Sequence, residues 1–313
     1  MTLTLAIPAH NDAEPLARLL ARAAALASVA RVVVVDDGSD APLEADALRA
    51  ASGLGDRLSL LRHDRPRGPG AARNAALDRV ETDYLLYLDA DDLPTRELDP
   101  LMADLAGRAF DFCLFQHHDT RLEQELRWGQ PTYDQNFWTA AGVALGALSP
   151  VPPAAAAYLA QTANYPWNKI YCTAFLREHG IACTEILVHE DVELHWRSFL
   201  NARTILASDR VGVIHFVAHQ GDRLTNRDGP ERLEVFAPLA RIAAEIDSHE
   251  GSVLALPFAR FALGLLGWIE GNLRGEFHAE LATRSAAFAA SLPEHVKAAL
   301  KDSAPDLATR YRL

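Results

Sequence analysis

The segment Arg31-Val32-Val33-Val34-Val35-Asp36-Asp37-Gly38-Ser39-Asp40 decides the fold class. Its four consecutive valines lack the polar alternation of a half-exposed strand, which is typical of a strand covered on both faces of a sheet. An acidic turn follows directly, where Gly38 permits a sharp change of chain direction. The segment therefore predicts a strand of a parallel sheet whose ligands lie beyond the carboxyl ends of the strands.

The first hundred residues extend the same alternation of strand and helix to either side of this segment. Such an alternation predicts an α/β fold with a parallel sheet built from right-handed crossovers. Expected strands cover residues 3–7, 31–35, 58–62 and 84–88, and expected helices cover residues 14–27 and 71–80.

The pattern loosens after residue 94. Further strands are expected at residues 110–115 and 211–217, and a helix at residues 192–201. The proline-rich stretch at residues 149–153 predicts a loop-rich insertion or hinge. From about Pro230 onward only helical patterns occur.

Composition and charge limit the classes of function. Hydrophobic residues make up 49% of the 313 residues and charged residues 23%, as in ordinary folded proteins. The formal net charge is −12, so no general basic surface is available for nucleic acid. Any phosphate chemistry must therefore rest on a local site or on a metal ion.

The cysteines and the apolar segments predict the cellular setting. The sequence has three cysteines, Cys113, Cys172 and Cys183. An odd number without CxxC spacing fits a reducing compartment. The N-terminus lacks the basic region of a secretory signal, so a cytoplasmic location is expected. Residues 252–269 are apolar, but Pro257 and Arg260 interrupt them, so a buried helix is expected, with a helix on a membrane or partner surface as the alternative.

The sharpest chemical feature is Asp89-Ala90-Asp91, directly after the fourth expected strand. Two carboxylates at this spacing can hold a hard divalent cation and leave positions for phosphate oxygens. The alternative is a solvated acidic turn in which Asp92 caps a helix. The Asp36-Asp37 turn can accept from a base N–H or a ribose hydroxyl, or it can be a simple strand-to-helix turn.

A third feature is the glycine-rich opening of the helix that begins near residue 71. The segment Gly68-Pro69-Gly70-Ala71-Ala72-Arg73-Asn74 predicts exposed N–H groups and one guanidinium able to face a phosphate. It is not a P-loop, because the Gly-Lys-Ser/Thr ending is missing.

These pieces, in this order, resemble the nucleotide-sugar domain of family 2 glycosyltransferases with the A-type fold. The matching segments are residues 7–11, 34–40, 68–77 and 86–92, and the resemblance covers about the first 110 residues. It implies a Rossmann-like fold with a mainly parallel central sheet and a C-terminal helical unit. The implied organisation is a nucleotide-sugar-binding half (1–110), an acceptor-binding and catalytic half of the same domain (111–225) and the helical unit (226–313).

The resemblance also implies roles for individual residues. His215 and His219 stand where the family often supplies a loop over the diphosphate, with packing or solvent contact as the alternative for each. The metal, Mn²⁺ or Mg²⁺, is expected on Asp89, Asp91 and His215. The donor is expected on Pro8, Ala9, His10, Asn11, Asp36, Asp37, Arg73, Asp89, Ala90 and Lys169.

Residues 167–171 and 188–192 resemble the second half of non-processive members. Transfer to a hydroxyl needs a general base, and a carboxylate at a helix start is well placed for it. Asp191 is the expected base, Glu190 is the alternate, and a helix cap is the structural alternative. Trp167 is expected either to stack on an acceptor sugar or to lie in the core, and Lys169 either to meet phosphate or to be a surface lysine.

The expected function is metal-dependent, inverting transfer of a sugar from a nucleoside-diphosphate sugar, with UDP favoured, to a hydroxyl of a glycan, lipid-linked or other acceptor. Residues 220–224 superficially resemble a signature of processive synthases, but Leu224 replaces its Trp, so non-processive transfer is expected. One alternative is a non-catalytic member that binds a nucleotide sugar or a partner. Another is a sugar-phosphate nucleotidyltransferase. Such an enzyme needs a glycine-rich basic loop after the first strand, and residues 8–12 do not provide one.

Three roles remain open for the helical unit. It can complete the acceptor pocket, form a homodimer, or make a peripheral contact on the inner face of a membrane that carries a lipid-linked acceptor. The apolar residues 254–268 are compatible with each of these roles.

Overall fold

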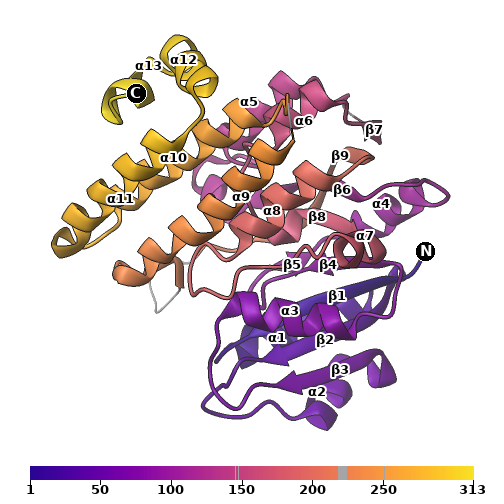
Figure 1. Ribbon diagram of the computed structural model, residues 1–313. Coiled ribbons are helices and arrows are strands. Elements are labelled where there is room, and N and C mark those ends of the chain that lie inside the picture. The colour runs from indigo at the N-terminus through magenta and orange to yellow at the C-terminus, as the bar shows by residue number, and fades with distance from the viewer. Residues whose placement is uncertain (145, 147, 218–223, 250) are drawn as a thin grey trace.

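The computed structural model describes residues 1–144, 146, 148–217, 224–249 and 251–313. Within these ranges the centre of the molecule is one nine-stranded mixed sheet, with helices on both faces and further helices at the C-terminal end (Figure 1). The strand order is β3-β2-β1-β4-β8-β6-β9-β5, and β7 also pairs with β9.

The first half of the sheet is parallel, as the sequence predicts. Val33 and Val35 of β2 pack with helix α3 on one face, while Val32 and Val34 pack with helix α1 on the other. This double cover explains the unbroken run of valines. The strands are β1 (Leu3–Ala9), β2 (Val29–Asp36), β3 (Leu58–Arg62) and β4 (Tyr84–Tyr87), and the helices are α1 (Ala13–Ala24), α2 (Ala45–Ser52) and α3 (Pro69–Arg79).

The second half of the sheet continues the first through an antiparallel strand. The short strand β8 (Lys169–Cys172) pairs antiparallel with both β4 and β6 (Phe112–Asp119), and β9 (Ile205–His215) is parallel to β6. Because β8 is antiparallel to both β4 and β6, these two strands run in the same direction, and β9 runs parallel to β6. The carboxyl ends of β1, β2, β4, β6 and β9 therefore open at one edge of the sheet, with Asp119 in register with His215.

The remaining elements of this half cover the sheet and its edge. Two-residue strands β5 (Leu93–Pro94) and β7 (Ser149–Pro150) pair antiparallel with β9, so the proline-rich stretch contributes a short strand besides a loop. The helices are α4 (Leu98–Leu105), α5 (Thr132–Ala141), α6 (Pro153–Leu159), α7 (Thr173–Glu178) and α8 (Asp191–Asn201).

One predicted strand is longer than its sequence pattern indicates. The expected strand at residues 211–217 overlaps only the later part of β9, which begins at Ile205 and ends at His215. The pairing with β6 shifts register between Ser208 and Val211, so the polar residues Asp209 and Arg210 lie at an irregularity in the strand. Because of this interruption, the alternation of apolar and polar residues does not reveal the first part of the strand.

The C-terminal region is helical throughout its described length, as expected. Helix α10 buries one face that includes Phe258, Leu263 and Leu266, which confirms the prediction of a buried helix there. Among the described helices none is long and apolar enough to cross a membrane. The helices are α9 (Phe236–Ser248), α10 (Ala255–Gly271), α11 (His278–Ser291), α12 (Glu294–Ser303) and α13 (Pro305–Arg310).

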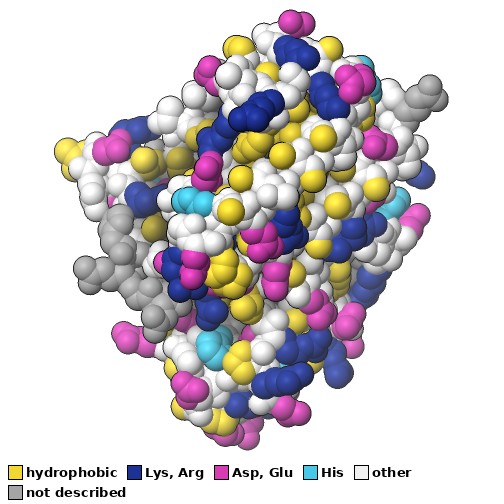
Figure 2. Space-filling view, turned by 60° about the vertical axis from the view of Figure 1, so that its left-hand side comes forward, with side chains coloured by type: hydrophobic (Ala, Val, Ile, Leu, Met, Phe, Trp, Pro, Cys, Tyr) yellow, Lys and Arg dark blue, Asp and Glu magenta, His cyan; other side chains and the backbone are white. Residues whose placement is uncertain are grey.

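The helical unit packs directly behind helix α8. Trp196 of α8 makes edge contacts with Phe258 of α10 at 5.1 Å between ring centroids, and Phe261 lies 5.2 Å away. Figure 2 shows hydrophobic side chains gathered in the upper half of this face, over the C-terminal helices, with basic side chains among them.

Candidate functional site

The loops that follow β1 and β2 are joined by hydrogen bonds. Asn11 takes a left-handed conformation (φ 59°), and its backbone N–H donates to Ser39 Oγ at 3.0 Å. The Asn11 amide also exchanges two hydrogen bonds with Asp40, at 2.9 and 3.1 Å. His10 Nδ1 lies 2.9 Å from the Asp37 carbonyl oxygen. These contacts hold His10 and Asn11 exposed at the edge of the sheet, where the donor is expected.

Asp36 is a structural anchor of the turn after β2. Its fully buried carboxylate accepts hydrogen bonds from the backbone N–H groups of Ser39 at 2.9 Å and Leu43 at 3.1 Å, and pairs with the Arg62 guanidinium. Burial alone would raise the pKa of this carboxyl, but the hydrogen bonds from Ser39, Leu43 and Arg62 outweigh it and lower the pKa.

Asp37 ties the same turn to the loop that precedes α3. Its carboxylate accepts from the backbone N–H groups of Gly68 at 2.7 Å and Arg67 at 2.9 Å, and lies 2.6 Å from His63 Nδ1. Its side chain is almost wholly buried. Asp37 thus has several protein partners, and its expected contact with a nucleoside stays a prediction.

The glycine-rich turn serves close packing. A Cβ on Gly70 would lie 2.2 Å from the Thr184 carbonyl oxygen and 3.0 Å from Glu190 Cβ. Helix α3 therefore abuts the segment that leads into α8. Gly68 and Gly70 are buried and the Gly68 N–H is bonded to Asp37, so the expectation of exposed N–H groups at this turn is wrong.

Arg73 joins the two acidic motifs. Its guanidinium, buried within α3, donates from Nη1 to Glu190 Oε1 at 2.6 Å and from Nη2 to Asp89 Oδ1 at 2.5 Å. Burial disfavours the charge, but Asp89 and Glu190 raise the pKa of Arg73 well above its usual value. Asp89 follows β4 and lies 16 positions from Arg73 in the sequence, whereas Glu190 precedes α8 and lies 117 positions from it. One guanidinium thus brings together two distant parts of the chain.

Asp191 begins α8 beside this ion-pair network. Asn164 Nδ2 donates a hydrogen bond to Asp191 Oδ1 and so fixes the carboxylate. Burial, aided by the neighbouring charge of Glu190, raises the pKa of Asp191 to about 8, although Arg73 opposes the shift. A carboxylate with a pKa near neutrality is suited to accept a proton, which supports Asp191 over the Arg73-paired Glu190 as the base.

Two predicted site residues lie beneath the surface. Lys169 is fully buried, with Nζ donating to the Tyr165 carbonyl at 2.8 Å and to Asn168 Oδ1 at 2.7 Å. Burial lowers the pKa of Lys169 to about 7, while Asp191 and Asp134 oppose the shift. The lysine is therefore held within the protein by Tyr165 and Asn168, and the expectation of a surface lysine is wrong.

Trp167 is also enclosed. The side chain is only 1% exposed, and its ring stacks on Tyr165 at 4.3 Å and on His215 at 4.8 Å between centroids. Of the two expectations for Trp167, the structure has the core residue. Ala90, Pro8 and Ala9 are buried as well, and their expected contact with the donor stays a prediction.

His215 is held by a carboxylate. Its Nδ1 lies 3.0 Å from each oxygen of the fully buried Asp92, which also accepts from the Phe216 N–H at 2.9 Å. Burial raises the pKa of Asp92, and the Asp92 carboxylate raises the pKa of His215 against the effect of its own burial. The expectation that Asp92 is a solvated helix cap is therefore wrong.

The donor chemistry at this edge fits a divalent cation. Asp89, Asp91 and His215 offer carboxylate oxygens and an imidazole, which suit Mn²⁺ or Mg²⁺. A carboxylate on one imidazole nitrogen, as between Asp92 and His215, is the arrangement that orients metal-binding histidines. Among the described residues no three His, Cys, Asp or Glu side chains already converge as a ligand set, so the shared metal site stays a prediction.

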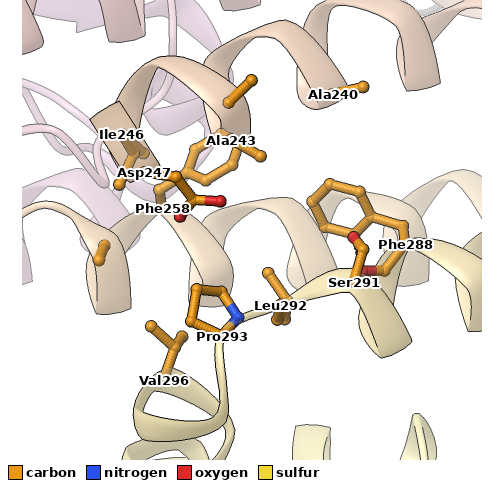
Figure 3. Close-up of a pocket in the computed structure, with 12 residues that line it drawn as sticks. Ala240, Ala243, Ile246, Asp247, Phe258, Phe288, Ser291, Leu292, Pro293 and Val296 are labelled. Atoms are coloured by element: carbon orange, nitrogen blue, oxygen red, sulfur yellow. Dashed lines mark hydrogen bonds between the residues drawn. The ribbon is translucent and has the colours of Figure 1, made fainter. Parts of the chain in front are cut away.

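Of two hollows in the protein, one adjoins these groups and the other lies among the C-terminal helices. An open one of about 390 Å³ adjoins Asp91 at the site edge and is lined by Asp12, Pro15, Arg18, Asp91, Thr120, Phe216 and Val217. The other, of about 230 Å³, lies between helices of the C-terminal unit and is mainly apolar, with Phe258, Phe288 and Pro293 around it (Figure 3). Of the acidic motif residues, Asp91 lines the first hollow and none lines the second.

Sequence reasoning missed Asn164 and the partnership of Asp92 with His215. Asn164 stands just outside the recognised segment 167–171, and a lone asparagine carries no signal of its own. His219 and residues 220–223 lie outside the described residues.

The site thus joins acidic residues at the strand ends, through a buried arginine, to an acidic helix start. The family model "Glycosyl transferase family 2" matches residues 4–151. The resemblance predicted from the sequence is thus confirmed over residues 4–151, and solved structures share the fold of nearly the whole chain.

The similar proteins agree with this assignment. The chain is 39% identical over 94 residues to a pre-mycofactocin glycosyltransferase of Mycobacterium tuberculosis, a match that covers 30% of this chain and 18% of that protein. It is 43% identical over 86 residues to the succinoglycan biosynthesis protein ExoU of Rhizobium meliloti, covering 28% and 25%. The chain thus spans at most a quarter of the length of these relatives.

Solved structures extend the likeness of the fold beyond the family model. Residues 1–349 of TarS from S. aureus, in complex with UDP-GlcNAc, align with a TM-score of 0.73 at 20% identity, over 95% of this chain and 83% of that one. The complex of the same TarS fragment with UDP aligns with a TM-score of 0.71 at 21% identity, over the same shares. The likeness therefore includes the second half of the sheet and the helical unit.

Proposed function

We propose that this protein transfers a sugar from a nucleoside-diphosphate sugar, with UDP favoured, to a hydroxyl of an acceptor. The observation that carries the proposal is the Arg73 bridge, which holds the Asp89 motif and the Glu190-Asp191 pair at one edge of the sheet. The UDP-GlcNAc complex of the similarly folded TarS supports the choice of donor class.

The proposed reaction uses Asp191 as the general base. The acceptor hydroxyl donates its proton to the Asp191 carboxylate as its oxygen attacks the anomeric carbon of the donor sugar. Attack from the face opposite the departing nucleoside diphosphate inverts the configuration at that carbon. Asn164 fixes one oxygen of Asp191, and the raised pKa of this carboxyl suits it to receive the proton.

The donor side of the site is assigned to the acidic turn after β4 and to the end of β9. We propose that Asp89, Asp91 and His215 hold Mn²⁺ or Mg²⁺, which would neutralise charge on the departing diphosphate. Arg73 keeps Asp89 in place through their ion pair. Non-processive transfer, with one sugar added in each binding event, remains a prediction, and so does a cytoplasmic location. Membrane contact or dimerisation through the helical unit also remains a prediction.

Ligand binding provides the first test. The midpoint of thermal unfolding is measured with UDP, GDP, CDP and dTDP, each with and without Mn²⁺ or Mg²⁺. A ligand at about 100 times its Kd stabilises the folded state by roughly 2.7 kcal/mol. We expect one nucleotide to stabilise the protein only with metal, and the effect to vanish in Asp91→Ala.

Activity provides the second test. Asp191→Asn should lower the rate of transfer by about 10² to 10⁴-fold while nucleotide binding persists. Asp46→Asn, which removes an almost fully exposed carboxylate on α2, is the matched control and should leave both unchanged. Full transfer activity in folded Asp91→Ala and Asp191→Asn variants would contradict the proposed mechanism.

A further inference from the structure

A tryptophan that the sequence motifs do not include is displayed on the loop after β6. The side chain of Trp128 is 64% exposed, in contrast to the enclosed Trp167. Its ring stacks on His118, with 3.8 Å between centroids and 19° between planes. An exposed indole with one face packed on another ring is held in place while its other surface stays available for a ligand.

The imidazole beneath Trp128 is itself fixed. The His118 side chain is fully buried, its Nδ1 accepts from the Gly129 N–H at 3.1 Å, and its Nε2 lies 3.1 Å from Glu123 Oε1. These bonds assign the Nε2–H tautomer and set the plane of the imidazole. Because little side-chain freedom remains to be lost on binding, Trp128 is preorganised as a stacking surface.

The loop that carries Trp128 rises from the edge where the reaction is proposed. His118 pairs in register with Ile214, and the next pair along is Asp119 with His215. The Asp119 N–H donates to the Gly129 carbonyl at 3.0 Å, which returns the loop to the end of β6. Thr120, the first residue of the loop, lines the same hollow as Asp91.

The surroundings of Trp128 favour a sugar over an apolar partner. Glu123, Glu125 and Arg127 are exposed around it, and Arg127 pairs with Glu125 at 2.9 Å. The C–H face of a pyranose ring packs on an indole, while its hydroxyls need charged or polar groups at the rim. An aromatic platform with such a rim matches a saccharide, whereas a protein contact would call for a wider apolar patch.

We propose that Trp128 stacks on a sugar ring of the acceptor, so that the acceptor is a saccharide bound along the loop after β6. This inference rests on the proposed function and names its acceptor class. It gives to Trp128 the stacking role that was one of two expectations for Trp167, at an exposed position in the loop after β6 rather than in the core.

The test compares Trp128→Ala with Trp128→Tyr and with Leu126→Ala, a control in the same loop whose side chain is 97% exposed. Donor hydrolysis without acceptor is measured first, then transfer to cellobiose, chitobiose and maltose, and to glycerol as a hydroxyl acceptor without a ring. Trp128→Ala should raise the KM for the saccharide that is used about tenfold, as expected for a lost contact of about 1.4 kcal/mol. Trp128→Tyr should retain most of the affinity, and Leu126→Ala and donor hydrolysis should not change.

The outcomes separate the two proposals. Donor turnover with an unchanged saccharide KM in Trp128→Ala would overturn the acceptor assignment and leave the proposed function intact. Equal use of glycerol and saccharides by the parent protein would also overturn it. Absence of both nucleotide binding and donor turnover in the parent protein would overturn the proposed function, and this inference with it.

Discussion

The acidic turns after β2 and β4 look alike in sequence and differ in what surrounds them. Asp36 after β2 is paired with Arg62 and with backbone donors of its own turn. Asp89 after β4 instead shares Arg73 with Glu190, which lies at the start of a helix far along the chain. The first turn thus uses its charge to hold local structure, and the second uses it to assemble a site from distant parts.

The pKa values show the same contrast. Asp36 has a lowered pKa because hydrogen bonds to its charged form outweigh burial, whereas burial and Glu190 raise the pKa of Asp191. A carboxyl with a lowered pKa stabilises the fold when ionised, and one with a raised pKa destabilises it when ionised. Stability and chemistry are therefore assigned to different carboxylates at the same edge of the sheet.

The largest expected effect comes from removing the shared cation. Arg73→Leu leaves Asp89 and Glu190 without their common partner and should lower the free energy of unfolding by about 3–5 kcal/mol. Arg62→Leu, the counterpart at the first turn, should cost about 1–2 kcal/mol, because Arg62 is partly exposed and Asp36 keeps its backbone donors. Urea unfolding of both variants measures the difference, and equal losses would show that the two turns are equivalent.

The second effect tests the anchoring role of Asp36. Asp36→Asn should lower the free energy of unfolding by about 1.5–3 kcal/mol at pH 7, because hydrogen bonds to a charged acceptor are lost. Since the folded-state pKa is lowered, this stabilisation is present above the unfolded pKa of about 3.9 and is lost as the pH falls through the folded value. Urea unfolding between pH 2 and 7 should show the variant and parent converging in acid, and a constant gap would refute the charge-based explanation.

Much of the fold can be predicted from the sequence because its strands are encoded by short, contiguous sequence patterns. The buried runs of β1 and β2 and the acidic residues after them are contiguous, so periodicity and spacing find them. Strand β8 has only four residues and begins with Lys169, and that lysine is buried by distant elements. Local pattern therefore could not identify this strand.

The site is less predictable because its decisive contacts are long-range. The segments that carry Arg73, Asp89 and Glu190 can be recognised separately, yet nothing in them says that one guanidinium joins two carboxylates. Trp128 stands in a polar stretch without periodic neighbours, and only the stacking on His118 distinguishes it. Exposure separates Trp128 from Trp167, and exposure is a property of the folded chain.

The smallest expected effect has the opposite sign to that at Asp36. Asp191→Asn should raise the free energy of unfolding at pH 8, because a neutral amide removes the cost of a charge in a largely enclosed place. The raised folded-state pKa, about 8, means that stability present below the unfolded value of about 3.9 is lost as the pH rises through this range. The Asn164 hydrogen bond can persist to the new amide oxygen.

Urea unfolding of Asp191→Asn and its parent from pH 3.5 to 8.5, with Asp46→Asn as the exposed control, measures this gain. We expect the two proteins to coincide near pH 3.5 and to diverge steadily above it, while the control follows the parent throughout. A more stable variant that has lost transfer activity would show that Asp191 is retained for chemistry at a cost in stability. A variant less stable than the parent at pH 8 would instead place Asp191 with Asp36, among the carboxylates that hold the fold.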